Sequence, residues 1–503
     1  MKDLSVLSHH SYFDYAIYLV YLNNFVQGKG LITYFHETVV PGSSSHWLAN
    51  HFTPLIYIFA YAFKVFPSFH MVNWLHTILL GFSPIILYIF SRRFIGRFGA
   101  FCISLTLIFN PTFQYITLYE FDFLRFIIPS GILMLGYVLG GYPAIYIILS
   151  LFIVLLIRED AAFLAFGIGI FMFFFQKKRR IMGFAIMVVS ILYLLTVLQV
   201  IMPYFRGEKT VMDAHVAAYM FYEFGRTPGE ILKNIFLSPI IFLKHIFHPM
   251  KLINWFMYFL PYAFVPFAAV NVLVIALPLL IFLSYSGSIK YISYMLYYVS
   301  PILVVVTWAT VIGLYKTQNI CKSKEWFKKW WEKPPSIERL SFAVLAASII
   351  CSIYFGPSPI SLQFWFSDFK VAPLHSTTFY RERYIPKQHD EIIQRAAKMI
   401  PEDVSVMAEF FLLTDVYKNR EIRCFPIYYI FEDLESIFNV DYIFIDKSHP
   451  MKAKSSGGPF KADNELYYLW IENRPDTYEK VFSEDGVILY KNKKIEFNHQ
   501  IKL

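Results

Sequence analysis

Charged side chains are scarce in this sequence. Only 16% of its 503 residues are Asp, Glu, Lys or Arg, whereas 57% are hydrophobic and the mean hydropathy is +0.48. Soluble domains carry about a quarter charged residues, so the composition excludes an ordinary soluble protein. The 19% of aromatic side chains also excludes a disordered chain. The sequence therefore indicates a folded membrane protein.

Cysteine is rare, and familiar ligand motifs are missing. The four cysteines lie far apart and form neither CxxC pairs nor a spacing pattern with His, so neither a zinc site nor a disulfide framework is indicated. The nucleotide motifs GxGxxG and GxxxxGK[ST] are absent as well. The sequence thus identifies no cofactor.

The charges divide the chain into two parts. Residues 1–356 contain 26 Lys and Arg against 14 Asp and Glu, whereas residues 357–503 contain 19 against 22. A basic, apolar part is typical of a membrane domain whose loops lie beside the bilayer. No nucleic-acid-binding motif accompanies the basic excess, so nucleic acid is not expected as a partner.

The apolar runs predict an all-α polytopic membrane domain with about ten spans over residues 73–356. A span needs roughly 20 apolar residues, or fewer where neighbouring helices shelter it. The predicted spans are about 73–91, 98–114, 124–140, 143–157, 161–175, 181–202, 252–264, 266–284, 291–314 and 340–356.

Three basic loops, at 92–97, 177–180 and 316–339, set the predicted orientation. The positive-inside rule places all three in the cytoplasm, and four predicted spans separate each loop from the next, so the parity agrees. The N-terminal segment 1–72 and the C-terminal domain 357–503 are then expected outside the cytoplasmic membrane of a bacterium.

The N-terminal segment 1–72 has no basic stretch followed by an apolar run, so no cleavable signal peptide is predicted. Either a further span precedes the chain, or the apolar segment 52–66, which contains Lys64, enters the membrane. We favour a half-inserted interfacial helix in this segment.

The C-terminal tail predicts a small α/β domain. Apolar residues recur at helical spacing over 388–400 and stop at Pro401. Short apolar runs at 404–408, 440–445 and 487–490 are typical of buried strands.

Acidic residues of the membrane part gather near the predicted outer face. An ionisable group at membrane depth is costly and usually faces a cavity or a partner, so these clusters are candidate site residues. Asp14, in an aromatic context after Phe13, could act as a base or simply cap the following helix. His51, after Asn50, could bind phosphate, carry a proton, ligate a metal or be a plain interfacial histidine.

Three further clusters carry charge. Glu120 and Asp122 could share a divalent cation or lie in a solvated loop. The triplet 158–160, Arg-Glu-Asp, lies between apolar runs, and a plain turn there would more usually contain Gly, Asn or Pro. We therefore favour a phosphate-binding role for Arg158. Arg206 could provide a second phosphate contact or snorkel to the interface.

Nine residues make up the predicted site. Its catalytic candidates are Asp14 and His51, and its substrate-binding candidates are Asn50, Glu120, Asp122, Arg158, Glu159, Asp160 and Arg206.

In this order, the clusters resemble a family of bacterial polytopic membrane proteins known as domain of unknown function 2079, which is similar to the GT-C glycosyltransferases. Relatives usually have Asp where this chain has Asn50, and an Asp-Phe-His-Pro-Glu pattern where it has residues 120–124. The motifs that carry the resemblance are Phe13-Asp14, residues 50–54, Leu87-Tyr88 before Arg92-Arg93, and residues 158–162, 203–207, 400–406 and 440–446.

The GT-C resemblance implies transfer of a sugar from a polyprenyl-phosphate donor to a glycan, lipid or protein acceptor outside the cytoplasm. It implies Asp14 as the base, Arg158 and Arg206 at the lipid phosphate, and His51 as an assistant there. Two alternatives stay open, a transporter or flippase for a lipid-linked glycan and a non-catalytic cell-envelope assembly protein. Transporters usually bury carboxylates in mid-span, whereas these gather near span ends, which favours an interfacial enzyme.

Overall fold

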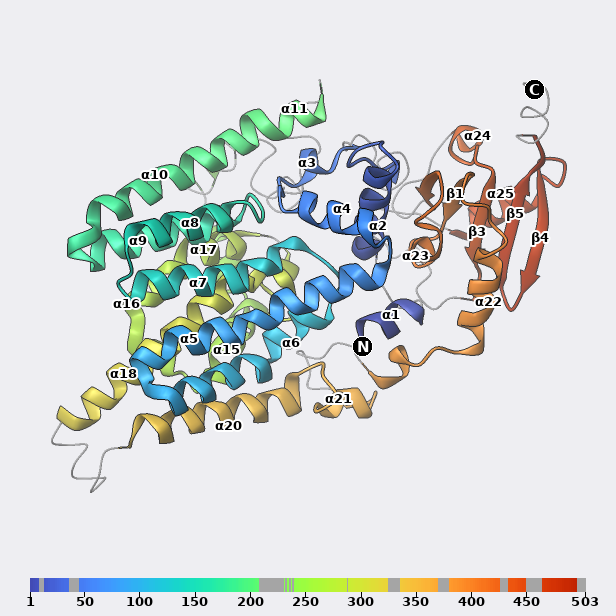
Figure 1. The fold of residues 1–503 in the computed structure, drawn as a ribbon. Helices are drawn as coiled ribbons and strands as arrows, with labels where there is room; N and C mark the ends of the chain where they lie inside the picture. The colour runs from blue at the N-terminus through green and yellow to red at the C-terminus, as the bar shows by residue number, and fades with distance from the viewer. Residues whose placement is uncertain are drawn as a thin grey trace.

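The computed structural model divides into a helical part and a C-terminal part built around a β-sheet (Figure 1). The sheet part follows the helical part in the chain and lies at one end of it in Figure 1. The structure describes residues 1–8, 13–35, 45–207, 230, 233–234, 237, 239–286, 288–323, 335–369, 380–425, 433–448 and 464–494.

Four short helices form the N-terminal segment. Helices α2 and α4 pack against each other, and an isolated bridge between Ile32 and His46 ties the intervening loop together. The apolar segment predicted to be interfacial is α4, whose Ile58, Tyr61 and Val65 side chains are exposed, and its insertion in a membrane stays a prediction. The helices are α1 (Lys2–Leu7), α2 (Phe13–Val26), α3 (Trp47–Asn50) and α4 (Ile56–Val65).

Helix α5 (Phe69–Phe109) contains the first predicted span, 73–91, and most of the second, 98–114, which continues into the following helix. Its backbone is non-helical at Gly96, where φ is 72° and ψ is 176°. An L side chain rarely adopts these angles, so glycine allows the chain to break here between two helical segments. The break lies within the basic loop 92–97, where the sequence predicts a connection.

The middle of the chain continues as helices joined by short connections. Helices α9 and α10 are packed neighbours, and α10 passes into one π-helical turn before α11. The elements are α6 (Pro111–Leu118), η2 (Phe123–Phe126), α7 (Ile127–Leu139), α8 (Ala144–Leu155), α9 (Ala161–Phe175), η3 (Lys177–Arg179), α10 (Arg180–Thr196), η4 (Val197–Ile201) and α11 (Met202–Arg206).

The last helical stretch runs from α14 to α21 and includes the long helix α18. The elements are α14 (Pro239–Ile246), α15 (Pro249–Phe259), η5 (Leu260–Tyr262), η6 (Val265–Ala269), α16 (Val270–Leu273), η7 (Val274–Ala276), α17 (Leu277–Tyr285), η8 (Ile289–Ile292), η9 (Tyr297–Val299), α18 (Ser300–Ser323), α20 (Ile337–Phe355) and α21 (Leu362–Trp365).

Among the described residues, five helical stretches are long and apolar enough to cross a membrane. In Tyr297–Gln318, 89% of the most apolar 18-residue segment is buried, whereas the corresponding share is 22–39% in the other four stretches. Helix α18 is therefore the central helix, and the other four expose much of their apolar surface. Four shorter apolar helices, 56–65, 123–139, 144–155 and 161–175, accompany them. Membrane character is thus confirmed, while the count of about ten spans stays a prediction.

The basic loops and the sheet lie at opposite ends of the helical part. In Figure 1 the connection between α9 and α10 and the end of α18 lie at the left, whereas α2, α4 and the sheet lie at the right. The predicted orientation requires such a separation. Residues 324–334 of the third basic loop lie outside the described residues, and the side of the membrane on which each end lies stays a prediction.

The C-terminal sheet has the strand order β2-β1-β3-β5-β4. Strand β1 (Ser405–Ala408) pairs in parallel with β2 (Glu421–Cys424) and β3 (Tyr442–Asp446). Strand β5 (Val487–Asn492) pairs antiparallel with β3 and with β4 (Tyr478–Glu484). The three predicted strands and the helix α22 (Gln388–Ala397) are confirmed. The remaining elements are η10 (Arg381–Tyr384), α23 (Leu413–Val416), α24 (Leu434–Ile437) and α25 (Asn464–Glu472).

The sheet domain contacts the N-terminal helices through the end of α23. The Tyr417 hydroxyl donates to the carbonyl of Pro67 over 3.4 Å, and its ring lies 6.1 Å from that of Phe63 in α4. Gln27, just after α2, donates to the Lys418 carbonyl over 3.2 Å. These contacts place the soluble-type domain beside α4 and beside α2, the helix that carries Asp14.

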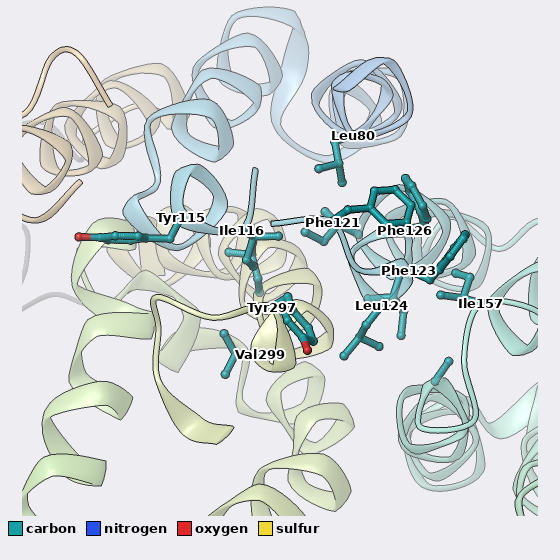
Figure 2. Packing of buried hydrophobic residues seen from close by; sticks show 14 of the residues in the cluster. Leu80, Tyr115, Ile116, Phe121, Phe123, Leu124, Phe126, Ile157, Tyr297 and Val299 are labelled. Atoms are coloured by element: carbon teal, nitrogen blue, oxygen red, sulfur yellow. The ribbon is translucent and has the colours of Figure 1, made fainter. Parts of the chain in front are cut away.

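Buried aromatic side chains pack together in the segment that carries Glu120 and Asp122. The rings of Phe121 and Phe123 lie 4.9 Å apart, and Phe59 of α4 contacts both at 5.3 and 5.0 Å. Figure 2 shows Phe121, Phe123 and Phe126 close together, with Tyr297 nearby. Edge-to-face packing of such rings adds stability beyond the buried area, so this cluster gives the site a rigid base.

Candidate functional site

Asp14 lies in the first turn of α2, at the centre of a group of ionisable side chains. Its carboxylate interacts electrostatically with Lys290, Asp122, Arg125 and His51. Burial raises the pKa of Asp14, and Asp122 raises it further, against the opposing effect of the cations. These partners come from three separate parts of the chain, around residues 51, 122–125 and 290, and folding brings them together at α2.

Arg158 joins two carboxylates in the same region. Its Nη1 lies 3.2 and 3.3 Å from the carboxylate oxygens of Asp122, and its Nε donates to Asp160 over 3.0 Å. Its Nη2 donates to the other oxygen of Asp160 over 2.5 Å. The side chain of Arg158 is only 4% exposed. The buried Asp122 and the partly exposed Asp160 thus pair with a buried guanidinium, and this pairing compensates the cost of removing the charges from water.

Asp122 is held from three directions. Besides Arg158, it accepts a hydrogen bond from the Tyr18 hydroxyl over 3.0 Å and from the backbone N–H of Leu124 over 2.7 Å. The second bond makes Asp122 the N-cap of η2, a role for which aspartate is favoured. The local turn therefore fixes the carboxylate, and α2 and Arg158 bind its remaining lone pairs.

His51 and Glu159 form a second pair next to the first. The Nδ1 of His51 lies 2.8 Å from Glu159, whose other oxygen accepts from the backbone N–H of Phe52 over 2.9 Å. Burial alone would raise the pKa of Glu159, but His51 and Arg158 outweigh it and hold the pKa at about 2. Glu159 is therefore ionised at physiological pH and orients the imidazole.

The other three predicted residues lie around this group. Glu120 accepts from the backbone N–H of Tyr15, next to Asp14, over 3.0 Å. Arg206 donates to the carbonyl of Ala49 at the end of α3 over 2.7 Å. Asn50, also in α3, donates to the His46 carbonyl over 3.5 Å. Glu120 adjoins the base candidate, while Arg206 and Asn50 belong to the neighbourhood of α3.

The sequence did not single out several residues that the structure places here. Tyr297 and Tyr298 lie with their rings 5.8 and 6.0 Å from the Arg158 guanidinium, and their hydroxyls are 3.1 Å apart. In a chain with 36 tyrosines no local pattern distinguishes these two. Arg125 had a weak signal, because it lies one turn beyond Asp122, and Lys290 had none.

The acids that the structure describes do not form a metal centre of their own. Among the described residues, no group of three or more His, Cys, Asp or Glu side chains is arranged to hold a metal ion. Glu120 and Asp122, the pair that could share a cation, bind Tyr15 and Arg158 instead. The divalent cation stays a prediction that the site's contacts do not favour.

A separate polar cluster lies at the carboxyl ends of β1 and β3. Glu409 is 1% exposed and accepts from the Asp446 backbone N–H over 2.7 Å and from Asn464 over 3.1 Å. Burial raises the pKa of Glu409 to about 7. His389 of α22 lies between Asp446 at 2.8 Å and Asp485 at 2.7 Å, and these carboxylates raise its pKa against the opposing effect of burial.

Residues 7–489 match the model of the family DUF2079, described as a predicted membrane protein. The chain belongs to this family. The motifs that predicted this membership run from Phe13 to Asp446, and the match covers them all. No curated protein matches the chain.

Two solved structures of the oligosaccharyltransferase of Archaeoglobus fulgidus are similar to the chain of this DUF2079 member. One has a tethered acceptor peptide containing the NVT sequon, with a TM-score of 0.42 and 15% identity. The other is a complex with Zn and sulfate, with a TM-score of 0.41 and 16% identity. Each similarity covers 97% of this chain and 70% of the other.

Proposed function

We propose that the chain is a membrane glycosyltransferase that moves a sugar from a polyprenyl-phosphate donor to an acceptor outside the cytoplasm. The observation that carries the proposal is the meeting of Asp14 with His51, Asp122 and the neighbouring cations. A carboxylate with a raised pKa, near both an imidazole and guanidinium groups, fits a reaction that removes one proton and releases one phosphate.

In the proposed reaction Asp14 is the base. It takes the proton of an acceptor hydroxyl while that oxygen attacks the anomeric carbon with inversion. The bond from the anomeric carbon to the phosphate oxygen breaks, and the phosphate leaves with the electron pair. A positioned base contributes about 10² to 10⁴ in rate.

The remaining predicted residues prepare this step. Glu159 orients His51, which assists at the phosphate, and Arg158 holds Asp122 and Asp160 in place. The positive charges of Arg158 and Arg206 favour the negative charge that develops on the leaving group. The apolar helix faces suit the isoprenoid chain, and the α/β domain beside α2 is suited to hold the acceptor.

A transporter is less well supported. Apart from Glu338, near the start of α20, the five candidate spans contain no Asp or Glu. A path for ions or charged substrates usually places such residues in mid-span. The acidic residues of the candidate site lie instead in the segments around α2, η2 and the turn between α8 and α9.

The test uses purified protein and polyprenyl-phosphate sugars labelled in the sugar. Wild type is expected to release the lipid phosphate. When a mixture of glycan, lipid and protein acceptors from outside the cytoplasmic membrane is added, it is expected to transfer the labelled sugar to one of them. Asp14→Asn is expected to reduce transfer by about 10² or more. Equal release from both proteins would refute Asp14 as the base, and no release from wild type with any donor would refute the transferase.

A further inference from the structure

Arg125 is a fully buried cation whose hydrogen bonding is incomplete. Its residue exposure is 0%, and its Nη1 donates to the carbonyl of Tyr119 over 2.9 Å. Its Nε and Nη2 are also buried, and neither has a hydrogen-bond partner in the described part of the chain. Buried donors are normally satisfied because an unmade bond costs free energy, so these two atoms are a notable exception.

Arg158 provides an internal comparison. Its Nε and Nη2 form a two-pronged donor pair that binds both oxygens of Asp160. This side-on pairing is the usual geometry of arginine with carboxylate and phosphate. The same two atoms of Arg125 are those without a partner. Arg158 is therefore saturated by the protein's own carboxylates, whereas Arg125 presents an open pair of donors suited to an oxyanion.

The surroundings of Arg125 are aromatic as well as charged. The rings of Tyr297 and Tyr119 lie 5.4 and 5.8 Å from its guanidinium, and Tyr119 is partly exposed. Two acids are also within electrostatic range, Asp122 and Glu120. Asp122 is engaged by Arg158, and Glu120 accepts from Tyr15. Neither provides a hydrogen bond to the open donors of Arg125.

We propose that the Nε and Nη2 of Arg125 bind the phosphate of the donor lipid, while Arg158 orders the acids of the site without touching the donor. This assignment deepens the proposed function and rests on it, because the phosphate is the leaving group of sugar transfer. Asp14, which interacts with Arg125, then has the reacting carbon close by.

The test measures binding of farnesyl phosphate and of farnesol, its uncharged counterpart, to the full chain in detergent micelles. The variant Arg125→Lys keeps the charge but loses the two-pronged donor pair, and Arg125→Gln loses both. The matched control is Arg92→Lys, an exposed arginine of α5. Wild type and the control are expected to prefer farnesyl phosphate, and the preference is expected to fall about tenfold or more in both Arg125 variants.

Three outcomes would overturn the assignment. The first is a wild type that binds farnesyl phosphate and farnesol alike, and the second is an unchanged preference in the Arg125 variants. The third is displacement of farnesyl phosphate by an equal concentration of inorganic phosphate. This result would mean that the Nε and Nη2 of Arg125 bind free phosphate and not a lipid phosphate. If the variants do not fold, wild type labelled with ¹⁵N-arginine replaces them. Farnesyl phosphate, but not farnesol, should then shift the signal of a buried Nε–H, and no shift would reject the site.

The two proposals fail separately. Binding that depends on Arg125, without any transfer from labelled donors, would leave the phosphate site standing and refute the glycosyltransferase. Transfer that depends on Asp14 but is unchanged in Arg125→Lys would leave the glycosyltransferase standing and refute the phosphate site.

Discussion

The guanidinium of Arg158 lies 3.2 and 3.3 Å from the two carboxylate oxygens of Asp122, although 36 residues separate them in the chain. The same guanidinium binds Asp160 from its own turn. The contact therefore ties the connection between α8 and α9 to the N-cap of η2. It also brings Asp122 beside Tyr18 of α2, the helix of Asp14.

Arg158→Gln should destabilise the protein strongly. The substitution leaves the buried Asp122 without its cation, and removing one partner of a buried pair costs about 3–5 kcal/mol. The free energy of unfolding in detergent is the measurement, with exposed Arg92→Gln as the control for which little change is expected.

A double-mutant cycle separates pairing from packing. Because Asp122→Asn removes one of the uncompensated charges, the double variant Asp122→Asn/Arg158→Gln should be more stable than the sum of the single effects indicates. Additive effects would show that Arg158 and Asp122 do not stabilise each other.

The rate of sugar transfer should decline in acid, and the decline should begin at a higher pH than it would if the base were an ordinary aspartate. The base must be ionised, and burial raises the pKa of Asp14 above its usual value. Activity should therefore rise with pH through that raised pKa and level off above it. The measurement is the initial rate of transfer across the acid range at saturating donor. An acid limb at the usual aspartate pKa would contradict the role of burial at Asp14.

The charged part of the site could be predicted from the sequence because charges are conspicuous in an apolar chain. Asp14, His51 and the triplet 158–160 each interrupt an aromatic or aliphatic run, and the structure brings all of them into one region. Their partners were not predictable in the same way. That Arg158 binds Asp122, and that the ring of Tyr297 lies beside the Arg158 guanidinium, depends on how distant helices pack, for which no local pattern exists.

The same contrast appears in the sheet. The predicted strands β1, β3 and β5 occupy its three inner positions, where burial on both faces produces continuous apolar runs. The missed strands β2 and β4 are its edges, and their sequences, EIRC and YEKVFSE, include charged side chains. Edge strands commonly carry charge, because this discourages pairing with another chain, and so they lack the apolar run of a buried strand.

The C-terminal domain should lose stability as the pH rises from about 5 to above 7. The pKa of Glu409 is raised from its usual 4.5 to about 7, so the folded state binds more protons between these values and its stability falls with pH. A shift of this size corresponds to on the order of 3 kcal/mol. The raised pKa of His389 acts in the same direction, since its stabilisation is complete below about 6.5 and is lost as the pH rises through the folded value.

Hydrogen exchange at the amides of β1 and β3 measures this effect in the full chain. Glu409→Gln, which cannot ionise, should flatten the dependence between pH 5 and 7 that wild type is expected to show. The exposed variant Glu479→Gln in β4 is the matched control. A wild-type protection that rises over this range would contradict the assignment of a protonated Glu409.

Gly96→Ala should destabilise the break within α5, whereas Gly81→Ala in the same helix should not. Both glycines have open space where a Cβ would lie, so neither substitution creates a clash. They differ in backbone conformation, because Gly96 has a φ of 72° and a ψ of 176° in a region essentially restricted to glycine. Alanine there should cost about 1–3 kcal/mol, while alanine at the helical position 81 should gain up to about 1 kcal/mol. Thermal unfolding of the two variants in the same detergent measures the difference, and equal melting temperatures would mean that α5 does not require its break at Gly96.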